Sequence, residues 1–130
     1  MPAWARLLAA GSTGGGIVIA GLIALAAWRE GGPGFWPALW QYVATAAFWE
    51  RALQFWLLSL LALVLTRVGS RTLPPVGAAL VAGGLVAFGQ SAYLMGQYRL
   101  EPGPVLSEAL LVALCYAAGS AVASRLYERL

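Results

Sequence analysis

Residues 76–96 of this chain read VGAALVAGGLVAFGQSAYLMG, and no side chain in the stretch is charged. About 20 mostly apolar residues in an α-helix are enough to cross a hydrocarbon core roughly 30 Å thick. Similar runs occur at about residues 7–28, 52–66 and 105–124. We therefore predict an all-α, polytopic membrane protein in which four transmembrane helices form a single integral membrane domain over residues 1–130.

The segments between these runs favour turns. The sequence is GGPG at residues 31–34, TLPP at 72–75 and EPGP at 101–104. Glycine raises the entropic cost of forming a helix and proline lacks the backbone donor, so helices tend to end at such segments. The connections are too short to fold into a separate soluble domain.

The composition excludes several classes of site. Hydrophobic residues make up 61% of the chain and charged residues 10%, whereas soluble domains average about 25% charged residues. His, Asp, Asn and Lys are absent, so the chain lacks the residues for a His-carboxylate metal site or a Ser-His-Asp triad. A single cysteine excludes an internal disulfide, and the scattered arginines do not resemble a nucleic-acid surface. We predict no cofactor, no nucleic-acid partner and no enzymatic activity.

An aromatic-rich connection at residues 35–51 joins the first two spans, and two interpretations of it stay open. Trp and Tyr favour the headgroup level of a membrane, which predicts a short interfacial helix from about Pro37. This helix would turn into the second span at Glu50 and Arg51, an interfacial ion pair. The alternative is one continuous tilted helix over Pro37–Thr66, which would place the two charges deep in the bilayer at a cost of several kcal/mol.

The distribution of arginine predicts the orientation of the chain. Lys and Arg in short loops favour the cytoplasmic side of a membrane. The side that holds both termini and the 67–75 connection carries more arginine than the other, so both termini are predicted to be cytoplasmic, and the default location is a prokaryotic inner membrane. The arginines on the first side are Arg6, Arg67, Arg71, Arg125 and Arg129, and those on the second are Arg29, Arg51 and Arg99.

Small residues recur at four-residue spacing along three of the spans and predict close helix packing. Helices associate in lipid through close backbone approach at small side chains. Because the second span is Leu-rich instead, we expect the other three to pack together and the second to lie against their outside. The predicted packing residues are Gly16, Ala20 and Ala24 in the first span, Ala79, Gly83, Ala87 and Ser91 in the third, and Ala109, Ala113, Ala117 and Ala121 in the fourth.

Polar side chains within two of the spans are the candidates for function. Glu108 is either an intramembrane proton or cation site or a carboxylate that complements the positive N-terminal end of its helix. In the third span a polar patch either hydrogen-bonds across helices or lines a transport pathway; its members are Gln90, Ser91, Tyr93 and Gln97.

Two functions are consistent with these features. The first is a non-catalytic accessory subunit of a larger energy-converting or transport complex, which contacts lipid and other integral membrane subunits through its small-residue helix faces. The alternative is a small homo-oligomeric transporter or channel that uses Glu108 and the polar patch between Gln90 and Gln97. A single four-helix chain of this length encloses no pore, so the second function requires self-association.

Overall fold

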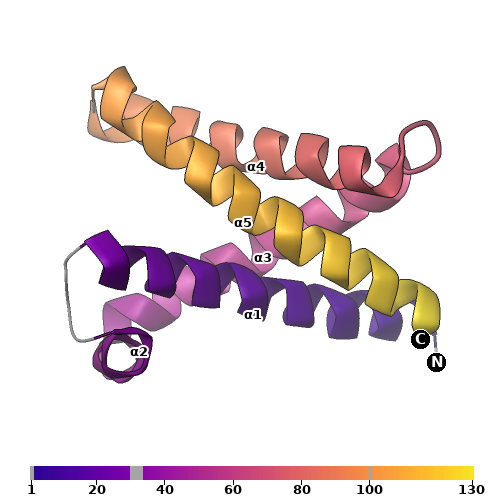
Figure 1. Cartoon of the computed structure of the whole chain (residues 1–130), viewed down its shortest axis with the longest axis horizontal. Coiled ribbons are helices and arrows are strands. Elements are labelled where there is room, and N and C mark those ends of the chain that lie inside the picture. The colour runs from indigo at the N-terminus through magenta and orange to yellow at the C-terminus, as the bar shows by residue number, and fades with distance from the viewer. Residues whose placement is uncertain (1, 30–33, 100) are drawn as a thin grey trace.

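The computed structural model describes residues 2–29, 34–99 and 101–130, which form helices and no strand. Four of these helices are long and apolar enough to cross a membrane, which confirms the all-helical prediction (Figure 1). The elements in chain order are α1 (Ala3–Arg29), α2 (Phe35–Val43), α3 (Ala46–Gly69), α4 (Pro75–Tyr98) and α5 (Pro102–Arg129).

The ends of the helices agree with the turn residues in the sequence. Pro75 stands at the start of α4, where its missing N–H is not required. Gly34 has φ +114, a left-handed conformation that glycine adopts without steric cost. The rest of the predicted break at 31–34 lies outside the described residues. All four long helices extend beyond the predicted spans at both ends.

The aromatic-rich connection forms a helix of its own, so the continuous helix over Pro37–Thr66 is wrong. The break lies at Ala44 and Thr45, where Thr45 is extended with φ −100 and ψ 139. Glu50 and Arg51 therefore lie within the first turns of α3 and do not mark the change of direction. Figure 1 shows α2 nearly end-on while the four long helices run across the view.

Both α3 and α5 contact the three other long helices. Within the described residues, α1 and α4 do not contact each other. The expectation that the second span lies outside the bundle is therefore wrong. On α3, one face exposes large apolar side chains such as Leu57 and Leu61, and the opposite face buries Ser59, Ala62 and Thr66. Because leucine dominates this span, its sequence does not reveal the face of small residues that packs against the other helices.

Glycine allows α5 to approach α4 and α1 closely. A Cβ atom added at Gly83 of α4 would lie 2.7 Å from the carbonyl oxygen of Ala113 and 2.7 Å from the amide nitrogen of Ala117. In the same way, a Cβ added at Gly119 of α5 would lie 2.7 Å from the carbonyl oxygen of Gly14 on α1. At both points backbone lies directly against backbone, so no side chain fits between the helices.

The predicted packing residues are buried on some helices and exposed on another. On α4 and α5, most of the small residues are buried between helices; Ala79, Gly83, Ala87, Ala109 and Ala117 are among them. On α1, Gly16 and Ala24 are exposed and Ala20 is half-buried. The α1 face that packs inside the chain instead includes Gly14 and Gly15, and Trp56 Nε1 of α3 donates a hydrogen bond to Ser12 Oγ over 2.9 Å.

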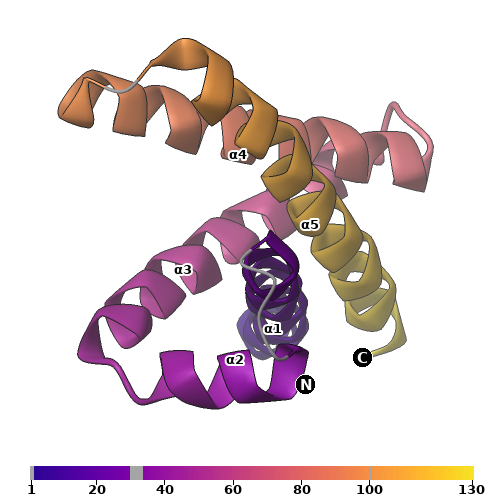
Figure 2. The same ribbon diagram turned by 60° about the vertical axis from the view of Figure 1, so that its left-hand side comes forward.

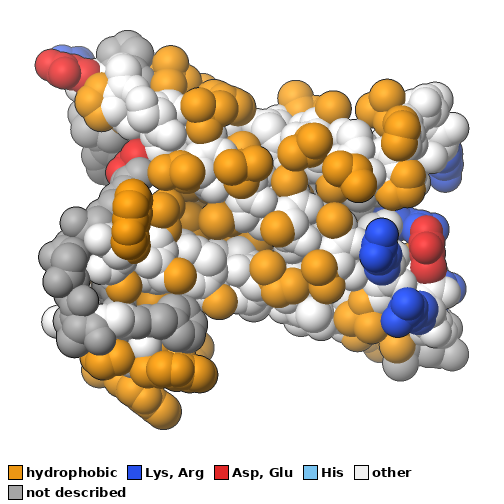
Figure 3. Space-filling model, in the orientation of Figure 1, with side chains coloured by type: hydrophobic (Ala, Val, Ile, Leu, Met, Phe, Trp, Pro, Cys, Tyr) orange, Lys and Arg blue, Asp and Glu red, His pale blue; other side chains and the backbone are white. Residues whose placement is uncertain are grey.

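Both termini and the α3–α4 connection lie at one end of the molecule, which we call the terminal end; α2 and the α4–α5 connection lie at the other, the α2 end (Figures 1 and 2). On the face shown in Figure 3, hydrophobic side chains cover the middle of the molecule and charged side chains lie near its two ends. This distribution is the one expected of helices that cross a hydrocarbon layer.

We predict that Gly83→Ala destabilises the protein by about 1–3 kcal/mol, because the added methyl group forces α4 away from α5. Gly84→Ala is the matched control, since a Cβ there meets nothing within 4 Å and alanine favours helix over glycine by about 1 kcal/mol. Thermal unfolding of both variants in mild detergent measures the difference. Equal midpoints for the two variants would contradict the close α4–α5 contact.

Candidate functional site: a polar cleft between the long helices

A cleft of about 890 Å³ lies between α1, α3, α4 and α5 in the half of the molecule near α2. It forms because α1 and the first half of α5 diverge toward the α2 end (Figure 1). Ligand sites in proteins commonly have volumes of about 300–1,000 Å³ and apolar walls with a few convergent polar groups. The apolar walls are formed by Ile19, Leu22, Ile23, Leu25 and Ala26 of α1, Ala47, Phe48, Ala52 and Phe55 of α3, Leu94 of α4, and Val105, Ala109 and Val112 of α5.

The polar side chains in the cleft come from α3, α4 and α5 and from the residue before α3. Arg51 projects from α3, Gln90 and Ser91 from α4, and Glu108 from α5, while Thr45 lies just before α3. The structure thus brings Glu108 together with two members of the predicted polar patch. It adds Arg51, which the sequence analysis had assigned to an ion pair at a helix end.

The charged groups of the cleft are more exposed than the amide and the hydroxyl. Arg51 and Glu108 are exposed, whereas Gln90 and Ser91 are half-buried. The two charged side chains are therefore the more accessible polar groups of the cleft.

A buried tyrosine contacts two of the residues that line the cleft. Tyr116 of α5 is fully buried, and its hydroxyl donates a 3.4 Å hydrogen bond to Gln90 Oε1. The ring of Phe55, which lines the cleft, lies 6.5 Å from the Tyr116 ring between centroids. Because this bond uses the carbonyl oxygen of the Gln90 side chain, it fixes the orientation of the amide. A tyrosine in an otherwise apolar helix usually requires a polar partner for its hydroxyl. The position of Tyr116 in an apolar run of the sequence therefore indicates a functional residue that the sequence pattern alone did not single out.

The remaining predicted polar residues lie elsewhere. Tyr93 is 62% exposed, Gln97 is exposed, and neither lines the cleft, so the patch on α4 is divided between two faces. Glu50 is also exposed outside the cleft, and within the described part of the chain no ion pair joins it to Arg51. Adjacent residues on a helix do not face each other, which accounts for their separation.

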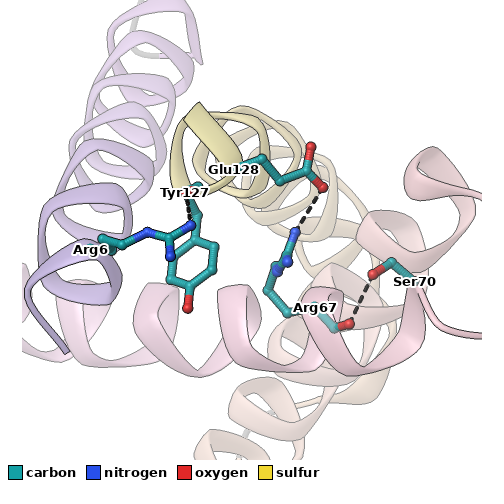
Figure 4. Close-up of polar contacts among 5 residues, drawn as sticks. All are labelled: Arg6, Arg67, Ser70, Tyr127 and Glu128. Carbon is teal, nitrogen blue, oxygen red and sulfur yellow. Dashed lines mark hydrogen bonds and ion pairs between the residues drawn. The ribbon is translucent and has the colours of Figure 1, made fainter. Parts of the chain in front are cut away.

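A second polar group of residues joins three helices at the terminal end (Figure 4). Arg6 of α1 donates a hydrogen bond of 2.7 Å to the backbone oxygen of Tyr127, and its guanidinium lies 4.4 Å from the centre of the Tyr127 ring. The Arg67 guanidinium of α3 lies 4.9 Å from the same ring and forms a 2.8 Å ion pair with Glu128. Cation–π contacts of this kind are worth about 0.5–1 kcal/mol when exposed and more when dry.

Metal binding has no support in the described ranges, since these contain no group of three or more acidic, Cys or His side chains placed around one ion. The cleft instead offers a guanidinium, a carboxylate, an amide and a hydroxyl within apolar walls. This set of groups can bind a polar group of either sign by charge-assisted hydrogen bonds.

The chain matches no protein-family model, no curated protein and no solved structure.

We predict that the Tyr116–Gln90 hydrogen bond couples α5 to α4 by about 0.5–1.5 kcal/mol. The test is a double-mutant cycle in which Tyr116→Phe and Gln90→Leu are made singly and together. Unfolding free energies in detergent give the coupling energy. Strictly additive effects of the two substitutions would show that the bond contributes nothing to the packing of α5 against α4.

Proposed function

We propose that this chain is a multi-pass membrane protein that serves as a non-catalytic accessory subunit of a larger energy-converting or transport complex. The observation that carries the proposal is the cleft near α2, which the side chains of the described residues leave unfilled. Protein interiors are normally close-packed, and a gap among apolar side chains forfeits their dispersion contacts. A neighbouring subunit that inserts an apolar helix between α1 and α5 would restore these contacts.

The walls and the polar groups of the cleft suit such a neighbour. Apolar side chains from all four long helices would contact an inserted helix, and Arg51 and Glu108 would pair with polar groups near its end. A separate small-residue face on α1 also supports association, because Gly16 and Ala24 are exposed and a Cβ at Gly16 meets nothing within 4 Å. Small residues on a helix surface allow a second helix to approach closely in lipid.

We further propose a prokaryotic inner membrane as the location, with both termini in the cytoplasm and α2 at the outer interface. The excess of arginine at the terminal end supports this orientation. The roughly perpendicular course of α2 and the exposed indoles of Trp36 and Trp40 support an interfacial position. Protease digestion of a terminal tag in right-side-out and inverted vesicles tests the orientation.

We predict that the tagged chain purifies from mild detergent with larger subunits in fixed stoichiometry, as measured by native mass spectrometry. Ala26→Trp should abolish this association, because Ala26 lines the cleft and an indole there occupies the space of the partner. Ala92→Trp is the matched control, since Ala92 is exposed on α4, does not line the cleft and is not part of a small-residue packing face. A chain that is always recovered alone or as a homo-oligomer, at an unchanged unfolding temperature, would contradict the proposal.

The second candidate function is a small homo-oligomeric transporter or channel. The observation that favours it is that Glu108, Gln90 and Ser91 lie in one cleft together with Arg51. Polar groups of either sign within apolar walls are the lining expected of a binding site for a polar solute.

For this candidate we predict that Glu108→Gln and Gln90→Ala each reduce solute or proton flux in proteoliposomes by tenfold or more. Tyr93→Phe is the control, because Tyr93 lies on α4 outside the cleft. Flux that is absent, or that is insensitive to both cleft substitutions, removes the transport pathway and leaves the subunit proposal standing.

A further inference from the structure

A second, smaller cleft of about 380 Å³ lies at the terminal end, between the end of α3 and its neighbours α1 and α5. About half of its lining is apolar and the rest is polar or basic. The lining residues are Leu7, Val64, Arg67, Val68, Ser70, Arg71 and Tyr127.

The surrounding structure holds the Arg67 side chain and the backbone of Arg71. Arg67 contacts the Tyr127 ring and pairs with Glu128, which restricts its side chain (Figure 4). The backbone around Arg71 forms a turn, in which the Arg71 amide donates to the Val68 oxygen over 3.3 Å and the Ser70 hydroxyl donates to the Arg67 oxygen over 2.8 Å. The Arg71 side chain is exposed beside this turn, so its guanidinium is accessible to an anion at the cleft.

The charge balance at the terminal end favours an anion. Five arginines and one glutamate lie there, so this end carries a net side-chain charge of +4. The glutamate, Glu128, accepts from only one guanidinium nitrogen of Arg67, and a guanidinium has five N–H donors. No acidic side chain is part of the cleft lining given by the described residues, so the two arginines make the lining favour an anion over a cationic headgroup.

We propose that this cleft binds the phosphate of an anionic glycerophospholipid. Arg67 and Arg71 donate hydrogen bonds to the phosphate oxygens, and an acyl chain runs along Leu7, Val64 and Val68. The apolar half of the lining, with Val64 and Val68 40% and 54% exposed, favours a lipid over a soluble phosphate. Basic clefts between membrane helices on the cytoplasmic side are suited to such headgroups. The site lies at the opposite end from the cleft near α2 and does not depend on the accessory-subunit proposal.

A structural role for the same arginines makes a different prediction. Cations near the end of a helix compensate the negative C-terminal end of its dipole, and this effect stabilises α3 with or without lipid. Lipid selectivity distinguishes the two roles, because dipole compensation does not depend on the headgroup.

The experiment is native mass spectrometry of the full chain in mild detergent, with phosphatidylglycerol or phosphatidylcholine of identical acyl chains. We expect the chain to retain phosphatidylglycerol preferentially. Arg71→Gln should weaken this retention about tenfold, the effect expected for loss of one charge-assisted hydrogen bond to the phosphate. Arg125→Gln removes the same charge at the same end from an exposed position outside the cleft, and it should retain the lipid as the unmodified chain does.

Four results would overturn the inference. The first is equal retention of the two lipids by the unmodified chain. The second is an equal loss in Arg71→Gln and Arg125→Gln, which would indicate diffuse surface charge rather than a site. The third is displacement of the lipid by inorganic phosphate at equal concentration, which would show that the cleft recognises the free anion. The fourth is a lower unfolding temperature of Arg71→Gln with unchanged lipid selectivity, which would indicate dipole compensation alone.

Discussion

The close approach of backbone to backbone at Gly14–Gly119 and at Gly83 opposite Ala113 and Ala117 is the contact on which the rest of this structure depends. In a membrane, apolar side chains gain little from burial against each other, so the distance between helices is set by how small the facing residues are. The α1–α5 contact lies toward the terminal end of both helices. Since they are in contact there and inclined to each other, they must separate at the α2 end, and the larger cleft results.

The positions of the polar side chains in the bundle depend on this divergence of α1 and α5. Deep inside, Tyr116 and Gln90 satisfy each other across the α4–α5 interface, where an unpaired polar group would be costly. Arg51 and Glu108 are exposed and line the open cleft. Ionisable side chains are tolerated within membrane helices where water, protein or a ligand solvates them. The same opening that leaves the apolar walls unfilled thus allows the chain to keep two charged side chains within its helices.

The two ends of the molecule have different chemistry. At the α2 end, α2 carries exposed indoles such as Trp36 and Trp40, and the larger cleft has one basic and one acidic side chain. At the terminal end, Arg6 and Arg67 contact the ring of Tyr127, and the arginines outnumber the carboxylates. This asymmetry supports a fixed orientation and gives each end a different kind of partner in our proposals: a neighbouring subunit at the first and an anionic lipid at the second.

The sequence by itself determined the helical class and the number of long apolar helices, because the length and hydropathy of a run are local properties. It also identified Gly83, Ala87, Ala109 and Ala117 as small residues on shared faces, since helical periodicity is local too. Only the tertiary structure decided that α3 contacts all three other long helices, that Gly16 faces outward, and that Arg51 shares a cleft with Glu108 and Gln90. These facts depend on how each helix is rotated about its axis and inclined to its neighbours. In a chain whose helices are apolar on every side, no amphipathic face encodes that rotation, and it is set by the few points where backbones come into contact.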